Sequence, residues 1–72
     1  MKLKNYVSLR RGGTSDLSRA IGVTRTEISI WANGKKQTPI KHCYAIEKAT
    51  GGAVTRKDLR PHDWHEIWPE LR

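Results

Sequence analysis

The residues of this sequence best suited to do chemistry lie between positions 24 and 33, on one predicted helix. Four of them carry hydrogen-bonding or cationic groups: Arg25, Thr26, Ser29 and Asn33. At 100° per residue Thr26, Ser29 and Asn33 occupy the side of the helix opposite Ile28 and Trp31, and Arg25 lies on its flank. Arg25 can donate two hydrogen bonds to guanine O6 and N7, and Asn33 can form the equivalent pair with adenine. The pattern predicts a helix that reads base edges in the major groove of double-stranded DNA.

Ile30 lies on the same outward side and is the least usual member of the set. An apolar side chain at this position suits a thymine methyl group. The alternatives are a lone exposed apolar residue or a contact with another chain. Thr26 and Ser29 can bond either bases or phosphates.

A second group of residues is predicted to hold DNA phosphates. Thr14 and Ser15 lie at the start of another predicted helix, where free N–H groups and the positive end of the helix dipole favour an anion. The remaining members are cations around the loop that leads to the fourth helix: Lys35, Lys36 and Lys41. Any one lysine could equally be a solvated surface charge, but no acid lies nearby to balance the group. Three more cations can extend this strip: Arg10, Arg11 and Arg19.

The distribution of charge agrees with a polyanionic partner. The chain has 72 residues and a net charge of +7. Residues 1–41 hold nine basic and two acidic side chains, whereas residues 42–72 hold five of each. All of the net charge therefore lies in the first part of the chain, which is expected to provide one face for DNA.

Short helices must position these groups, because apolar residues recur at helical spacing in four segments. The segments are Leu3, Tyr6 and Val7; Leu17, Ala20 and Ile21; Ile28 and Trp31; and Ile40, Cys43, Ile46 and Ala49. Hydroxyl caps are expected at three helix starts: Thr14 or Ser15 for the second helix, Thr24 with Glu27 for the third, and Thr38 before Pro39 for the fourth. Asp63 can cap a short helix in the tail. The content predicts an all-α bundle of four to five short helices with a short helical tail.

The segment on either side of Gly22 fits a helix-turn-helix. Gly22 tolerates the positive φ of a tight turn, and Ser18 is small enough for two helices to approach closely. A new helix is then predicted to begin at once, after Thr24. An ordinary helical pair shares the apolar spacing, but the glycine, the cap and the local positive charge favour a helix-turn-helix.

Several short runs also carry a likeness to a known family. They are Ile21-Gly22-Val23-Thr24, Ile28-Ser29-Ile30-Trp31, Pro39, Cys43, Ala45-Ile46-Glu47, Thr50-Gly51-Gly52-Ala53-Val54-Thr55, Asp58-Leu59-Arg60-Pro61 and Asp63-Trp64. In these runs the chain resembles the Cro and YdaS-type antitoxin group of phage and prophage repressors, within the lambda-repressor-like superfamily. The resemblance implies a lambda-repressor-like fold and a sequence-specific, dimeric or higher DNA-binding repressor. Thr14 departs from the Gln often found at this position, so a phosphate clamp there would be shorter.

Other classes of function are poorly supported. The longest apolar run is three residues, so no membrane span or signal-peptide core is expected. Cys43 is the one cysteine, which fits a reducing cytoplasm, and its place on an apolar helix face predicts a buried thiol rather than a nucleophile. His62 and His65 lack enough partners for a zinc site. So small a core leaves no pocket for a small-molecule substrate. We therefore expect no enzyme, cofactor or metal.

The sequence divides into a DNA-binding domain over residues 1–61 and a tail over residues 62–72. The tail carries an apolar stripe of Trp64, Ile67 and Trp68. This stripe either folds back onto the core or contacts another subunit. Because one helix reads too few base pairs to select a site, a homodimer or higher homo-oligomer is expected, with the stripe as its interface.

Two other functions stay open at this point. One is an antitoxin-like module that acts mainly by binding a partner protein. The other is a nonspecific basic module that binds any nucleic acid. Nonspecific binding does not explain the polar face of the helix over residues 24–33. No aromatic residues form a platform on which the bases of single strands could stack.

Overall fold

Helices form all the regular secondary structure of residues 1–9 and 11–71, the part of the chain that the computed structural model describes. They are α1 (Leu3–Leu9), α2 (Gly13–Ile21), α3 (Arg25–Ala32), α4 (Ile40–Ala49), α5 (Arg56–Leu59), α6 (Trp64–Ile67) and a final 3-10 turn over Pro69–Leu71. The predicted all-α bundle with a short helical tail is confirmed.

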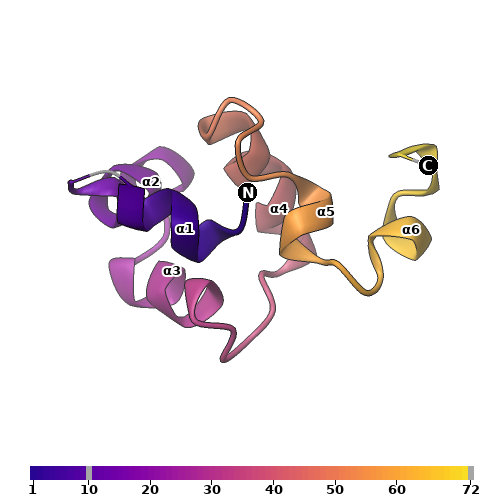
Figure 1. Ribbon diagram of the computed structural model, residues 1–72, viewed down its shortest axis with the longest axis horizontal. Coiled ribbons are helices and arrows are strands. Elements are labelled where there is room, and N and C mark those ends of the chain that lie inside the picture. The colour runs from indigo at the N-terminus through magenta and orange to yellow at the C-terminus, as the bar shows by residue number, and fades with distance from the viewer. Residues whose placement is uncertain (10, 72) are drawn as a thin grey trace.

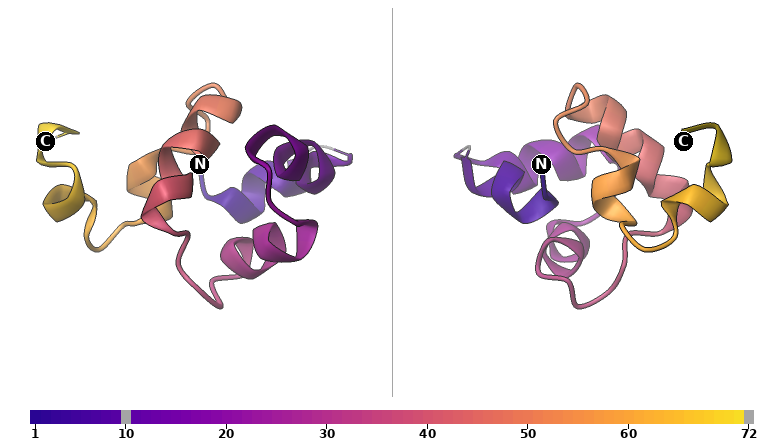
Figure 2. Two further views of the ribbon diagram at one scale, coloured as in Figure 1. Left: turned by 180° about the vertical axis from the view of Figure 1, so that it is seen from behind. Right: turned by 45° about the vertical axis from the view of Figure 1, so that its right-hand side comes forward.

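The helices pack in two groups that share one core. α1 packs against α2 and α3, α2 also packs against α3 and α4, and α4 packs against α5. Figure 1 shows α1, α2 and α3 at one end of the molecule, α4 and α5 beside them, and α6 beyond α5 at the other end. The views in Figure 2 agree that the tail lies at the edge of the bundle, beyond α4 and α5. The Cα atoms span 34 × 24 × 20 Å.

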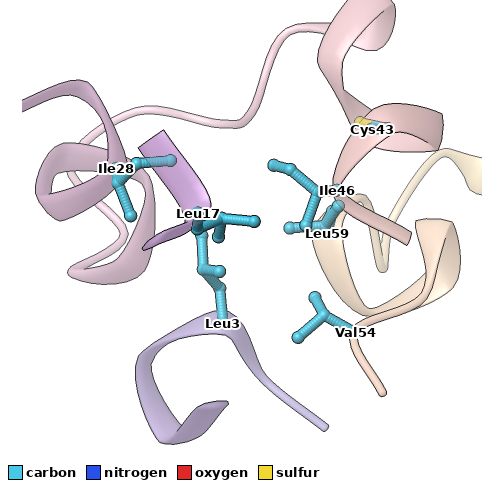
Figure 3. Packing of buried hydrophobic residues seen from close by; sticks show 7 residues of the cluster. All are labelled: Leu3, Leu17, Ile28, Cys43, Ile46, Val54 and Leu59. Carbon is cyan, nitrogen blue, oxygen red and sulfur yellow. The ribbon is translucent and has the colours of Figure 1, made fainter. Parts of the chain in front are cut away.

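One apolar cluster holds the bundle together. Its buried members are Leu3, Leu17, Ile28, Cys43, Ile46, Val54 and Leu59. Figure 3 shows Leu3, Leu17 and Ile28 on one side of the cluster and Ile46, Val54 and Leu59 facing them from the other. Every helix from α1 to α5 contributes to this cluster, and Val54 lies just before α5. The core therefore fixes how α2 and α3 lie relative to the rest of the chain.

The ends of the predicted apolar stripes are not buried. Ile40 is 49% exposed, and Ala20 and Ala49 are also exposed. The helices that pack against α4 cover Cys43 and Ile46 in its middle turns and leave both of its ends uncovered. The prediction that Ile40 and Ala49 lie on the buried side of α4 is wrong.

The turn between α2 and α3 has the expected helix-turn-helix chemistry. Gly22 has φ 76° and ψ 32°, a left-handed conformation that a side chain would strain. Its N–H donates to the Ser18 carbonyl oxygen at 2.9 Å, and the N–H of Val23 donates to the same oxygen at 3.1 Å. The Glu27 N–H then donates to Thr24 Oγ1 at 3.1 Å, and the Thr24 N–H donates to Glu27 Oε1 at 3.4 Å. The predicted capping box is confirmed, and Ser18 is buried as expected.

Three other predicted side-chain caps are wrong, because no side chain caps the start of α2, α4 or α6. Gly12 adopts φ 74° and α2 begins at Gly13, so Thr14 and Ser15 lie inside the first turn. Pro39, not Thr38, precedes the first residue of α4, and no side chain caps this helix. Asp63 precedes α6 as predicted, but its carboxylate pairs with Arg60 instead of the helix N–H groups.

The apolar stripe of the tail divides between two environments. Trp68 packs against the core, and the Arg56 guanidinium lies 5.4 Å from its ring centre. Trp64 and Ile67 are partly buried but are not part of the core packing. The Lys57 ammonium lies 4.5 Å from the Trp64 ring centre. Folding back onto the core therefore accounts for Trp68 alone of the three.

None of the helices in the described part of the chain is long and apolar enough to cross a membrane.

Candidate nucleic-acid interface

α3 packs Ile28 and Trp31 against the core and leaves most of its polar residues exposed. Ile28 is fully buried, and Trp31 is partly buried with its ring centre 5.5 Å from that of His42 on α4. The exposed residues on and just after this helix include the predicted base readers Arg25, Thr26, Ser29 and Asn33. The capping box at Thr24 fixes where α3 begins, and so fixes the direction in which Arg25 and Thr26 leave the helix.

A first groove, of about 530 Å³, joins α3 to the start of α2. Its α3 side is formed by Arg25, Thr26 and Ser29, and its α2 side includes Thr14 and Ser15. The first N–H groups of an α-helix have no acceptor within the helix, so the first turn of α2 presents donors here. The fold thus brings predicted base readers and predicted phosphate contacts, from different helices, to one concave surface.

A second groove, of about 660 Å³, lies at the other end of α3. Asn33, directly after α3, and Lys36, in the loop that follows, line it on one side, and Lys2 and Lys4 line it from the start of α1. Sequence reasoning missed Lys2 and Lys4. Their spacing around Leu3 predicts only that they are exposed. The local sequence does not indicate the helix against which α1 packs.

α1 lies antiparallel to α3 along these grooves. Its C-terminal part contributes Val7 to the first groove, which holds the start of α3, and its N-terminal part contributes Lys4 to the second, which holds the end of α3. Ser29 lies on α3 and Asn33 directly after it, one turn further on, and they line the first and second groove respectively. The two grooves therefore flank a single face of α3.

Other predicted contacts lie outside these two grooves. Ile30 is partly buried and lines neither groove. Lys35 and Lys41 are exposed and also line neither. Arg19 forms an ion pair with Asp16 at 2.7 Å, which lowers the charge it adds to the basic strip. Arg11 is exposed, and Arg10 is outside the described residues.

Comparison with known proteins identifies the family of this chain. Residues 3–67 match the family described as "Bacterial toxin YdaS". The chain belongs to the YdaS family. It is also 39% identical over 69 residues to the Escherichia coli (strain K12) protein named "Putative transcriptional regulator YdaS", with 89% of this chain and 70% of that protein covered. The family description reads toxin, where the sequence resemblance suggested antitoxin.

The matched region contains nearly all of the surface described above. Of the groove residues named here, Lys2 alone lies before the part of the chain that matches the YdaS family. All six α-helices fall within residues 3–67. The family assignment therefore applies to the helix-turn-helix and to both grooves, as well as to α6.

The single cysteine of this YdaS-family chain is buried and lines neither groove. Burial raises the pKa of the Cys43 thiol to about 11, although nearby Arg60 opposes the shift. The thiol donates to the carbonyl oxygens of Pro39 at 3.4 Å and Thr38 at 3.7 Å. A neutral, hydrogen-bonded thiol in the core is a poor nucleophile. Among the described residues, His62 and His65 are not part of any cluster of three or more potential metal ligands.

Proposed function

We propose that this chain is a transcriptional regulator that binds double-stranded DNA sequence-specifically and reads an operator with α3 in the major groove. The observation that carries the proposal is the first groove, where Arg25, Thr26 and Ser29 of α3 meet the first turn of α2. A helix-turn-helix uses these two positions for base contacts and for backbone contacts respectively. The name of the E. coli relative supports a regulatory role.

Each group has a specific task in this proposal. Arg25 donates to a guanine, Thr26 and Ser29 contact bases or phosphates near it, and Asn33 contacts a base one turn further on. Ile30 is the weakest member, because it is partly buried and lies outside both grooves.

Phosphates are held on both sides of these base contacts. Thr14 and Ser15 offer backbone N–H groups and hydroxyls at the start of α2, where the helix dipole favours an anion. The lysines Lys35, Lys36 and Lys41 add positive charge on the side of the loop between α3 and α4. No catalysis, cofactor or small-molecule substrate has a part in this activity, and we place it in the cytoplasm with the DNA.

We further propose that two or more copies bind together. One recognition helix contacts only a few base pairs, so a second copy about 34 Å away is required for site selection. The charged first part of the chain faces DNA, which leaves the electrically balanced part, residues 42–72, for the contact between copies. Within it, Trp64 and Ile67 are the partly buried apolar residues of α6 that the core does not use, and Trp68 lies beside them.

A second candidate function is action through a partner protein. The family description as a toxin favours it, as does the exposed apolar surface of α4 at Ile40 and Tyr44. Inhibition of growth by the wild-type chain but not by an Arg25→Ala variant would assign the effect to DNA binding. Equal inhibition by both would favour the protein partner.

The direct test of the main proposal is selection of bound sequences from a pool of random duplexes. We expect an enriched motif with two-fold symmetry. A labelled duplex with that motif should bind at least a thousandfold more tightly than random duplex near 150 mM salt. Equal affinity for the two duplexes would refute sequence-specific regulation and leave nonspecific nucleic-acid binding.

A further inference from the structure

The second groove carries positive charge that the protein does not neutralise. Lys2, Lys4 and Lys36 line it and are exposed. Within the described residues, no ion pair joins any of these lysines to an acid. The acid in its lining, Asp58, already accepts the N-terminal ammonium at 2.7 Å and the Thr55 N–H at 3.0 Å.

The donors of this groove come from three separate parts of the chain. Lys2 and Lys4 belong to the start of α1, Lys36 and Gln37 to the loop after α3, and His62 to the turn before α6. All of these side chains are exposed around the hollow and can donate hydrogen bonds, His62 through its ring N–H. The lining thus suits an anion that carries several acceptor oxygens.

The two grooves lie at opposite ends of α3, and the length of α3 matches the width of the DNA major groove. α3 has eight residues and is therefore about 12 Å long. The major groove of B-DNA is about 12 Å wide. With α3 in the major groove, groups at its two ends can reach the two strands that border it. In that arrangement the start of α2 would contact one strand, and the second groove would face the other.

We infer that the second groove is a binding site for backbone phosphates of the DNA strand opposite the one held by α2, with Lys2 and Lys4 as its added contacts. The inference rests on the proposed function, because it takes α3 as the helix in the major groove. Asn33 connects the base contacts of α3 to the second groove, since it lines this groove and lies one turn after Ser29 on the same face. A base contact at Asn33 and a phosphate contact at Lys4 are then made side by side.

The test compares charge removal inside the groove with charge removal elsewhere. The double variant Lys2→Ala/Lys4→Ala removes the two α1 charges, and Lys2→Arg/Lys4→Arg keeps them. Lys48→Ala is the matched control, because Lys48 is exposed on α4 and lines neither groove. The full chain is used throughout, and thermal unfolding establishes that the variants fold alike.

Affinity for duplex is measured over a range of salt concentrations. Each lost phosphate contact lowers the magnitude of the log–log slope by about 0.9, so the alanine pair should lower it by about 1.8 per bound subunit. Near 0.1 M salt this corresponds to roughly 60-fold weaker binding per subunit, for every duplex sequence. The arginine pair should restore both quantities, and Lys48→Ala should change neither. Equal slopes for the alanine pair and the Lys48→Ala control would overturn the inference.

Ethylation of single phosphates locates the contact. We expect interfering phosphates on both strands of each half-site for the wild-type chain, and loss of those on one strand for Lys2→Ala/Lys4→Ala. An unchanged pattern would also overturn the inference. The salt measurement works on duplex of any sequence, so it stays informative even if the wild-type chain proves nonspecific and the proposed function fails.

Discussion

Arg60 and Asp63 form a two-point ion pair that ties the tail to the core. Arg60 Nε lies 3.1 Å from Asp63 Oδ1, and Arg60 Nη2 lies 2.7 Å from Asp63 Oδ2. The third nitrogen, Nη1, donates to the carbonyl oxygen of the buried residue Thr38 at 3.0 Å. The pair therefore links the turn before α6 to the loop before α4. Hydrogen bonds from Arg60 hold the pKa of the Asp63 carboxyl below its usual value.

Replacement of this carboxylate should destabilise the chain in a pH-dependent way. A lowered pKa in the folded state stabilises the fold above the unfolded value of about 3.9, and this stabilisation is lost as the pH falls through the folded pKa. We expect Asp63→Asn to melt at a lower temperature than the wild type at pH 7, and the difference to shrink towards zero near pH 2. Melting curves at the two pH values check this. A difference that is the same at both would show that the ion pair does not cause it.

Base reading and phosphate binding should respond differently to substitution. Arg25→Ala removes a predicted bidentate contact and should cost about 1–3 kcal/mol on the selected site, with relaxed preference at one base pair. Lys36→Ala should weaken all sequences alike and reduce the magnitude of the salt slope by about one. Binding to a panel of single-base variants of the site distinguishes the two effects. If Arg25→Ala leaves the ranking of sites unchanged, α3 is not placed as proposed.

The parts of the fold that were predictable from sequence depend on neighbouring residues. Gly22 and the Thr24–Glu27 capping box define the turn between α2 and α3 through contacts that span three or four positions. Contacts between residues so close in sequence can be predicted from the residue types alone. The predicted start of α2 is wrong because Gly12, in a left-handed conformation, takes the N-cap position, so that the helix begins at Gly13, before the hydroxyl residues expected to cap it.

The candidate site was only partly predictable, for a different reason. Arg25, Thr26 and Ser29 follow from helical periodicity, and the structure adds that they share a groove with Thr14 and Ser15. The part played by Lys2 and Lys4 depends on how α1 crosses α3, and this crossing is set by Leu3 packing in a core shared with Leu17 and Ile28. Contacts between distant segments of this kind leave no local pattern.

The Cys43 thiol should be protected until the chain unfolds. Because burial raises its pKa from 9.0 to about 11, the folded thiol stays neutral at pH 8 and should react with a thiol reagent orders of magnitude more slowly than in denaturant. A raised pKa stabilises the fold below pH 9.0, and this contribution, at most about 2–3 kcal/mol, is lost as the pH rises towards 11. Reaction rates with and without denaturant test the prediction. Rapid reaction of the folded chain would show that the thiol is accessible.

Because Trp68 lies in a different environment from Trp64 and Ile67, substitutions in the tail can distinguish packing within one chain from contact between copies. Trp68 packs against the core, so Trp68→Ala should lower the free energy of unfolding by about 2 kcal/mol, less than the same substitution of a fully buried tryptophan.

Trp64 and Ile67 lie outside that packing, so a Trp64→Ala/Ile67→Ala variant should fold with little loss of stability. If these residues join two copies, the double variant should sediment as a monomer. It should also lose affinity for a palindromic site while binding a half-site as the wild type does. A double variant that remains a dimer would exclude α6 as the interface and leave the exposed surface at Ile40 and Tyr44 as the next to test.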